Sequence, residues 1–166
     1  MFKKIGPSEL KENAFQIIGK EWLLVSCGNQ KQYNTMTASW GGIGVVWNKN
    51  VVTVYVRPQR YTFEFMEKYD HFSISVLPSA FKKELMYLGQ VSGRDEDKIS
   101  KCHLNPRFDD EIIEFEEARL NIKCKTLYHS FIQEEGFIDQ VLKGKIYPQK
   151  DFHMMYIGEI EKIEIK

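Results

Sequence analysis

The chain has 166 residues, 43% of them hydrophobic and 28% charged, a composition that is typical of a globular protein and excludes a disordered one. Lys plus Arg and Asp plus Glu are equal at 23 each, so no net charge draws the protein toward nucleic acid or an anionic membrane. The length fits one domain, residues 1–166, with a core that needs no disulfide or metal.

The cysteines and the N-terminus bear on the compartment. Three cysteines without a CxxC pair argue against a disulfide framework and favour a reducing compartment, where we expect them to be buried apolar side chains. The N-terminal residues lack the apolar segment of a signal peptide, and no apolar run approaches the roughly 20 residues that span a bilayer. We therefore expect a cytoplasmic protein with no membrane partner.

The first half of the chain predicts three strands and a short helix. Apolar β-formers fill residues 21–27, a more polar run covers 33–39, and β-branched residues make 51–57 the clearest strand. The glycine-rich stretch 41–44 indicates a bend or a close approach of the backbone. A helix is expected over about 61–69.

A strand and two helices follow. Apolar and serine residues alternate over 71–77, as in a half-buried strand. Ser79 is a plausible N-cap for a helix over about 80–88. Residues 92–103 indicate a turn that leads into another short helix, with Asp95 near the N-terminal end of that helix.

The last third returns to strand patterns. Residues 118–133 alternate, 137–144 indicate a helical turn or a strand edge, and 152–166 form a long strand whose isoleucines slip out of register, which a bulge would explain. About six or seven strands with short helices clustered between them predict a mainly β, antiparallel barrel rather than a doubly wound parallel sheet.

Residues 34–42, NTMTASWGG, combine hydroxyl and amide side chains with the large indole of Trp40. A planar heteroaromatic ring with polar edges would find backbone N–H groups and a stacking surface there. The same residues are also compatible with an ordinary Thr- and Ser-rich strand.

Residues 57–62, RPQRYT, place two arginines at the end of a strand, with Thr62 where a helix is expected to begin. Helix N-termini and planar guanidinium groups both bind phosphate. The segment therefore predicts a phosphate site, although two surface arginines beside a helix N-cap give the same pattern.

Residues 92–98, SGRDEDK, offer the Ser92 hydroxyl, a glycine that permits an unusual backbone conformation, and Lys98 one turn after Arg94 on the short helix. These groups could close a binding pocket. The other interpretation is a solvated, charged helix face.

The four histidines have no i, i+4 partner and no neighbouring CxxC motif, so we expect no metal site. His129 follows Tyr128 on a predicted strand, and this position is typical of a hydrogen-bonded histidine at the edge of a sheet. The sequence contains no recognisable catalytic acid–base pair, so catalytic residues are not assigned.

Together, the three segments 34–42, 57–66 (RPQRYTFEFM) and 92–98 resemble the flavin reductase-like family of FMN-binding split barrels, and the flavoredoxin branch is the most similar. The likeness is continuous from about residue 20 to 103 and weaker beyond. It implies a Greek-key split β-barrel that forms a homodimer, with FMN near the interface.

The resemblance also implies a set of FMN-binding residues. Those expected along the isoalloxazine ring and the ribityl chain are Asn34, Met36, Thr37, Ala38, Ser39 and Trp40. Those expected at the phosphate end are Arg57, Arg60, Tyr61 and Thr62, with Ser92, Gly93 and Lys98 closing the same pocket. His129 matches a histidine that the flavoredoxin branch places near the flavin.

Trp40 departs from many flavin reductases, which have a small residue at this position and use flavin as a diffusible substrate. The tryptophan favours a tightly held FMN. We therefore expect electron transfer through bound FMN, from NAD(P)H or a redox protein.

Three alternatives remain open. The chain could be a flavin- or haem-linked binding module without redox chemistry, or a reductase that supplies reduced flavin to an oxygenase. A pyridoxamine-phosphate oxidase-type enzyme would need a second basic cluster, which the sequence does not show.

Overall fold

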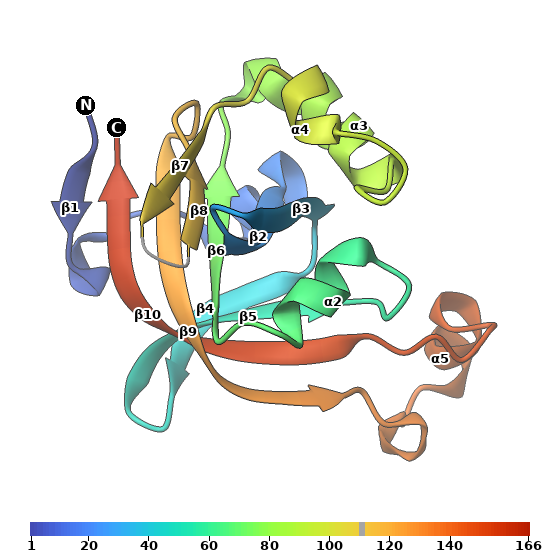
Figure 1. Ribbon diagram of the computed structural model, residues 1–166. Coiled ribbons are helices and arrows are strands. Elements are labelled where there is room, and N and C mark those ends of the chain that lie inside the picture. The colour runs from blue at the N-terminus through green and yellow to red at the C-terminus, as the bar shows by residue number, and fades with distance from the viewer. Residues whose placement is uncertain (110–111) are drawn as a thin grey trace.

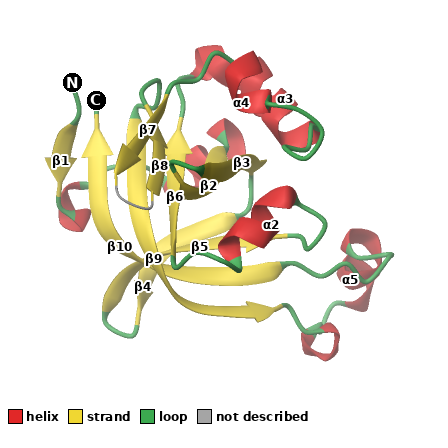
Figure 2. Cartoon of the chain, viewed as in Figure 1, coloured by secondary structure: helices red, strands yellow, loops and turns green. Residues whose placement is uncertain are grey.

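The computed structural model describes residues 1–109 and 112–166, and over these residues strands predominate (Figure 2). The strands are β1 (Lys3–Ile5), β2 (Leu23–Asn29), β3 (Gln32–Ala38), β4 (Gly41–Val46), β5 (Lys49–Val56), β6 (His71–Val76), β7 (Pro106–Asp109), β8 (Ile112–Phe115), β9 (Leu120–Phe131) and β10 (Met154–Ile165). The helices are α1 (Ala14–Gln16), α2 (Tyr61–Met66), α3 (Lys82–Gln90), α4 (Lys98–Lys101) and α5 (Gln140–Ile146). Single turns of 3-10 or π helix occur at Pro7–Glu9, Ile17–Glu21, Ser79–Phe81 and Glu134–Gly136.

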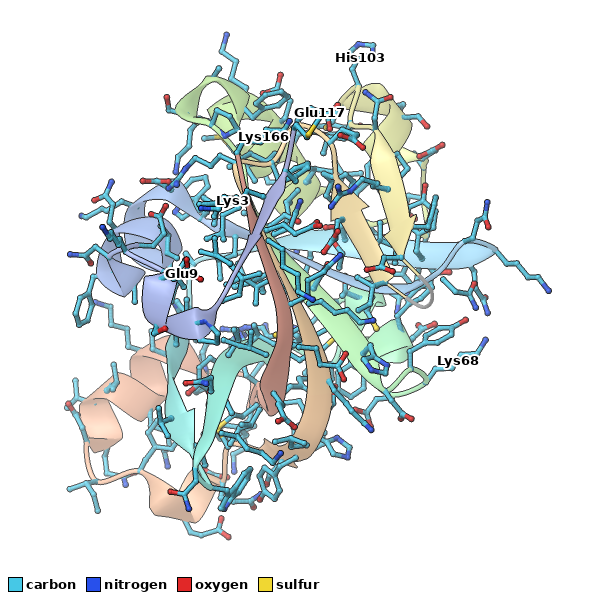
Figure 3. The ribbon with its side chains drawn as sticks, turned by 90° about the vertical axis from the view of Figure 1, so that its left-hand side faces the viewer. Lys3, Glu9, Lys68, His103, Glu117 and Lys166 are labelled. Atoms are coloured by element: carbon cyan, nitrogen blue, oxygen red, sulfur yellow. The ribbon has the colours of Figure 1, made fainter. Side chains whose placement is uncertain are left out.

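The main sheet is antiparallel and has the strand order β3-β2-β6-β9-β10-β5-β4, while β7 and β8 form a separate hairpin. Strand β10 pairs with β5 through its first half and with β1 through its last residues. The two chain ends therefore lie side by side (Figure 1), and Figure 3 shows Lys3 and Lys166 on this edge.

The two edges of the main sheet meet because the chain passes directly from one to the other. Ala38 ends β3 at one edge, and Gly41 begins β4 at the opposite edge. Three residue steps span at most about 11 Å, so the sheet must curl until its edges are neighbours. The predicted antiparallel barrel is confirmed, and the curl brings residues 34–40 close to the end of β5.

The bulge predicted for the last strand is also confirmed. The register between β9 and β10 shifts at Ile157/Gly158 and again between Ile160 and Lys162. A Cβ atom at Gly158 would lie only 2.5 Å from the ring of Phe72 on β6, the strand on the other side of β9. The bare glycine thus lets the bent strand pack against β6.

Two apolar clusters flank strand β2, which explains its uninterrupted run of apolar residues. Leu23, Val25 and Cys27 face the barrel interior, whereas Leu24 faces a second cluster under α3, α4 and the β7–β8 hairpin. A strand that is buried on both faces loses the alternation that marks a half-buried one. All three cysteines are buried and unpaired, as expected.

The long strands β9 and β10 form one wall of the molecule and extend beyond it (Figure 1). At their far end the connecting segment, residues 132–153, projects from the barrel and carries α5. Of the two alternatives predicted for 137–144, a helical turn or a strand edge, the helix is found, as α5.

Of the two alternatives for 41–44, the close approach of the backbone is found: Gly41 lies against the carbonyl oxygen of Thr53, and the stretch pairs with β5 as a strand. Other local predictions are wrong. The helix expected over 61–69 ends at Met66. The predicted strand count is too low, because β1, β4 and the β7–β8 hairpin were not recognised.

The predicted N-cap is also wrong. Ser79 begins a 3-10 turn, and α3 starts only at Lys82. Asp95 precedes α4 as expected, and the cap of that helix is Asp97, whose carboxylate accepts a hydrogen bond from the backbone N–H of Ser100. Within the described residues, no helix has the length and apolar character needed to cross a membrane.

Candidate functional site

Two adjoining cavities follow the end of β3 on the barrel wall. The larger has a volume of about 540 Å³, the smaller about 140 Å³, and they share Met36, Arg57 and Arg60. We call them the basic half and the ring half of one cleft. The other residues of the basic half are Asn34, Gln59, Tyr61, Thr62, Gln90, Val91, Ser92 and Lys98. The other residues of the ring half are Thr37, Ala38, Ser39, Trp40, Tyr55 and His153.

The basic half is built on a buried contact between β3 and α2. The Asn34 carboxamide, 4% exposed, donates a hydrogen bond of 2.7 Å from Nδ2 to the hydroxyl of the fully buried Thr62. Helix α2 begins at Tyr61 with Arg60 as its N-cap, so Thr62 lies in its first turn, as the sequence predicted. The Thr62 side chain fixes the Asn34 carboxamide.

Gly93 lies against the same carboxamide. A Cβ atom at this position would stand 2.1 Å from Asn34 Oδ1 and 3.1 Å from the Tyr61 ring. No side chain could be accommodated without moving Asn34. The glycine that the sequence marked for an unusual backbone is therefore required by close packing.

Lys98 is a buried cation, not part of a solvated helix face. Its side chain is 4% exposed, and its ammonium donates hydrogen bonds of 2.8 Å to the carbonyl oxygens of Leu88 and Val91. Burial and the nearby charge of Arg60 lower the pKa of Lys98 to about 8. An ammonium has three donors, so one remains for an anion in the cavity. Arg94 precedes α4 and does not share the helix with Lys98.

The two arginines of the cleft have different partners. Arg60 donates from Nη1 to the carbonyl of Gly89 at 2.6 Å and is exposed at the cavity wall. Arg57 forms an ion pair with Asp151, donates to the carbonyl of Ile146 at 3.1 Å, and lies over the Tyr147 ring. Arg57 therefore joins the barrel to segment 132–153, whereas Arg60 is the arginine better placed for an anion.

The ring half contains a pair of aromatic side chains. The Trp40 indole, 41% exposed, lies 4.7 Å from the His153 ring between centroids. His153 is 8% exposed, and its Nδ1 is hydrogen-bonded to the Tyr147 hydroxyl at 2.7 Å. Burial, followed by the charge of Arg57, lowers the pKa of His153 to about 4, so the imidazole is neutral at pH 7.

The structure brings nearly all of the sequence-predicted residues to this cleft. There are two exceptions: Gly93 lies behind Asn34 and lines a neighbouring cavity, and His129 lines another cavity of about 220 Å³. There its Nδ1 lies 3.1 Å from the Glu67 carboxylate, and its ring stacks on Tyr156. Within one chain His129 thus has the partner expected of an edge histidine and is not at the cleft.

Sequence reasoning missed His153 and Tyr55. Tyr55 pairs with Met155 across β5 and β10, and this pairing sets His153 beside the end of β5. Tyr55 and His153 are distant in the sequence and become neighbours only when β5 and β10 pair. No local sequence pattern could therefore have identified either residue. Within the described residues, no cluster of His, Cys, Asp and Glu is arranged to hold a metal ion.

Both the sequence and the fold are similar to those of known proteins. The family model described as "Flavin reductase like domain" matches residues 17–166. An uncharacterised protein of Pyrococcus abyssi (strain GE5 / Orsay) is 24% identical over 139 residues, which cover 82% of this chain and 69% of that protein.

Two solved structures share the fold. The FMN-binding domain of a flavin reductases-like enzyme from Shewanella baltica OS155 has a TM-score of 0.70 and 19% identity, over 99% of this chain and 77% of that chain. Flavoredoxin of Desulfovibrio vulgaris (Miyazaki F) has a TM-score of 0.68 and 22% identity, over 99% of this chain and 76% of that one. These likenesses agree with a split β-barrel.

Proposed function

The chain belongs to the flavin reductase-like family, and from this premise we propose that it is a flavoprotein that binds FMN in the cleft and transfers electrons through it. One observation carries the proposal. The cleft has Lys98 at one end, Arg57 and Arg60 where its two halves adjoin, and two flat rings, Trp40 and His153, at the other end. FMN has the same division, with a phosphate dianion at one end and a planar ring system at the other.

In the basic half, the side chains serve an anion. Arg60 and Lys98 offer charge-assisted hydrogen bonds, which are about twice as strong as neutral ones. The Ser92 hydroxyl lines the same cavity, and the bond between Asn34 and Thr62 holds its wall in place. A bound dianion would favour the protonated form of Lys98 and raise its pKa from about 8.

In the ring half, the side chains fit a flat, uncharged surface with polar edges. Trp40 offers a stacking face, and Ser39 and Tyr55 offer hydroxyl groups. His153 stays neutral at pH 7, so it can donate a hydrogen bond without placing a second cation beside Arg57. Bound FMN would supply the redox chemistry, and these residues orient the ring and limit its contact with water.

We also propose that residues 1–166 act as one flavin-binding domain that forms a homodimer. Trp47, Tyr128 and Phe131 expose large aromatic surfaces at and near the ends of β4 and β9, and Trp47 packs on Tyr128 at 6.1 Å between centroids. Exposed aromatic groups of this kind mark interaction surfaces. In such a dimer the cavity of His129 would lie near the interface, where His129 could approach the partner's flavin.

The proposed electron donor is NAD(P)H or a redox protein, and the first experiment separates these cases. The visible spectrum of the purified protein is recorded, FMN is added, and the bound flavin is titrated with NADH and NADPH without oxygen. Flavin peaks that bleach with a nicotinamide support a reductase. Peaks that persist point to a protein donor or to a binding module. Failure to bind any flavin contradicts the proposed function.

A further inference from the structure

A third cavity, of about 600 Å³, opens beside the ring half of the cleft. We call it the apolar cavity. Its lining residues are Ala14, Phe15, Ile18, Gly19, Ser39, Trp40, Gly41, Gly42, Ile43, Tyr55 and Ile132. None of these lining residues is charged, in contrast to the arginines and lysine of the basic half.

The apolar cavity adjoins the ring half of the cleft. Ser39, Trp40 and Tyr55 line both the apolar cavity and the ring half. A molecule in the apolar cavity would therefore lie against the same three side chains that we assign to the isoalloxazine ring. That is the position from which a substrate could exchange electrons with a bound flavin.

The cavity is open because three of its lining residues are glycines and because the side chain of Phe15 points away from the protein. A Cβ atom at Gly19 or Gly42 would meet no other atom within 4 Å. Phe15, on α1, is 89% exposed, although such a side chain normally gains free energy from burial. An apolar ligand would cover Phe15 and fill space that a packed core would not leave empty.

From these contacts we propose that the apolar cavity binds an uncharged, ring-containing carbonyl compound, such as a quinone, as the electron acceptor. The inference rests on the proposed function. The apolar walls favour a neutral molecule, the Trp40 indole favours a flat ring, and the hydroxyl groups of Ser39 and Tyr55 can donate to a carbonyl oxygen. A dinucleotide is disfavoured here, because its phosphates would face no cation among the lining residues.

The proposed reaction transfers electrons and protons in equal number from the flavin to the quinone. A quinone in the apolar cavity would take up two electrons and two protons to become the hydroquinone, and bound FMN in its reduced form would supply both. No other oxidant or reductant is needed.

The test uses the flavin-free protein and menadione, a neutral naphthoquinone, with binding followed by saturation-transfer NMR. Gly42→Leu adds a side chain where there is room for one and lies outside both halves of the FMN cleft. We expect this variant to weaken menadione binding by about tenfold or more, equivalent to the loss of a few buried methylene contacts. Gly44→Leu is the control, because Gly44 also has no atom within 4 Å of its Cβ position but does not line the cavity.

A second variant tests the same cavity in case Gly42→Leu does not fold. Phe15→Asp replaces an exposed side chain at the first turn of α1, where a carboxylate is tolerated, and should also weaken menadione binding. FMN affinity is measured in parallel for every variant. Loss of menadione binding with unchanged FMN affinity supports the inference. If menadione does not bind, or binds equally well to both variants, the inference is overturned, while the proposed function fails only if FMN itself does not bind.

Discussion

The Asn34 carboxamide and the Thr62 hydroxyl form a buried hydrogen bond of 2.7 Å that ties β3 to α2. The two residues come from different sequence motifs, 28 positions apart. Their contact joins the first two of the three segments that resemble flavin-binding proteins. The third segment closes on the same pair, because Gly93 packs against Asn34.

Replacing Thr62 by valine should cost about 1–3 kcal/mol of unfolding free energy, because the buried Asn34 N–H group then loses its partner. FMN affinity should fall as well, since the cavity wall loosens. Chemical denaturation and fluorescence titration measure the two effects. Thr126→Val is the matched control, because the Thr126 hydroxyl is buried without a hydrogen-bond partner among the described residues. Equal destabilisation by both substitutions would contradict the assigned role of Thr62.

Gly93→Ala should reduce FMN affinity more than it reduces stability. The new methyl group would stand 2.1 Å from Asn34 Oδ1, so the carboxamide must rotate away from its place in the wall. Gly44→Ala serves as the control, since nothing lies within 4 Å of its Cβ position. The flavin dissociation constant of each variant is compared with that of the unaltered protein. Unchanged FMN affinity in Gly93→Ala would show that Asn34 does not shape the flavin site.

FMN affinity should decrease as the pH rises above about 8, because Lys98 then loses its proton in the flavin-free protein. The sign follows from linkage: a phosphate dianion binds the ammonium better than the amine, so affinity is full below this pKa and declines above it. Lys98→Met should bind FMN more weakly at neutral pH and show a flatter pH profile. Lys101→Met, on the same helix but exposed and paired with Glu96, should keep the original profile. A pH profile that Lys98→Met leaves unaltered would remove Lys98 from the site.

His153 should make stability depend on pH between about 6.5 and 4. Its pKa is lowered from 6.5 to about 4 in the folded protein, so in this window the unfolded state binds more protons. Stability therefore decreases as the pH falls through the window. His153→Gln should reduce this slope, as measured by denaturation at several pH values. His103 projects from the surface (Figure 3), so His103→Gln should leave the slope unchanged. A slope that is equal in both variants would contradict the prediction.

The sequence predicted those parts of the fold and site that depend on local pattern. The strand at 51–57 and the bulge near Ile160 follow from residue types and register. The motif 34–42 predicted a ring site, and its residues do line the ring half. The residues that sequence reasoning missed depend on distant pairing: His153 reaches the cleft only because β10 pairs with β5.

The alternatives that the sequence left open have the same origin. Glycines at 41–44 allow either a bend or a close approach of the backbone, and pairing with β5 selects the close approach. Residues 92–98 allow either a solvated face or a pocket wall, and Lys98 is buried at the cavity because two carbonyl oxygens accept hydrogen bonds from its ammonium. In both cases tertiary contacts that are invisible in the local sequence decide between the alternatives.

Arg60 and Arg57 should respond differently to replacement, although both line the cleft. Arg60→Ala should weaken FMN binding by about 1.5–3 kcal/mol, the contribution of a charge-assisted bond to phosphate, with little effect on folding. Arg57→Ala should instead reduce stability, because the carbonyl of Ile146 loses its donor and Asp151 loses its ion pair and keeps only the hydrogen bond from Gln59. Fluorescence titration and denaturation of both variants distinguish the two roles, and Arg60→Lys should restore part of the FMN affinity by keeping the charge. If Arg57→Ala weakens FMN binding more than Arg60→Ala at equal stability, then Arg57 rather than Arg60 holds the phosphate.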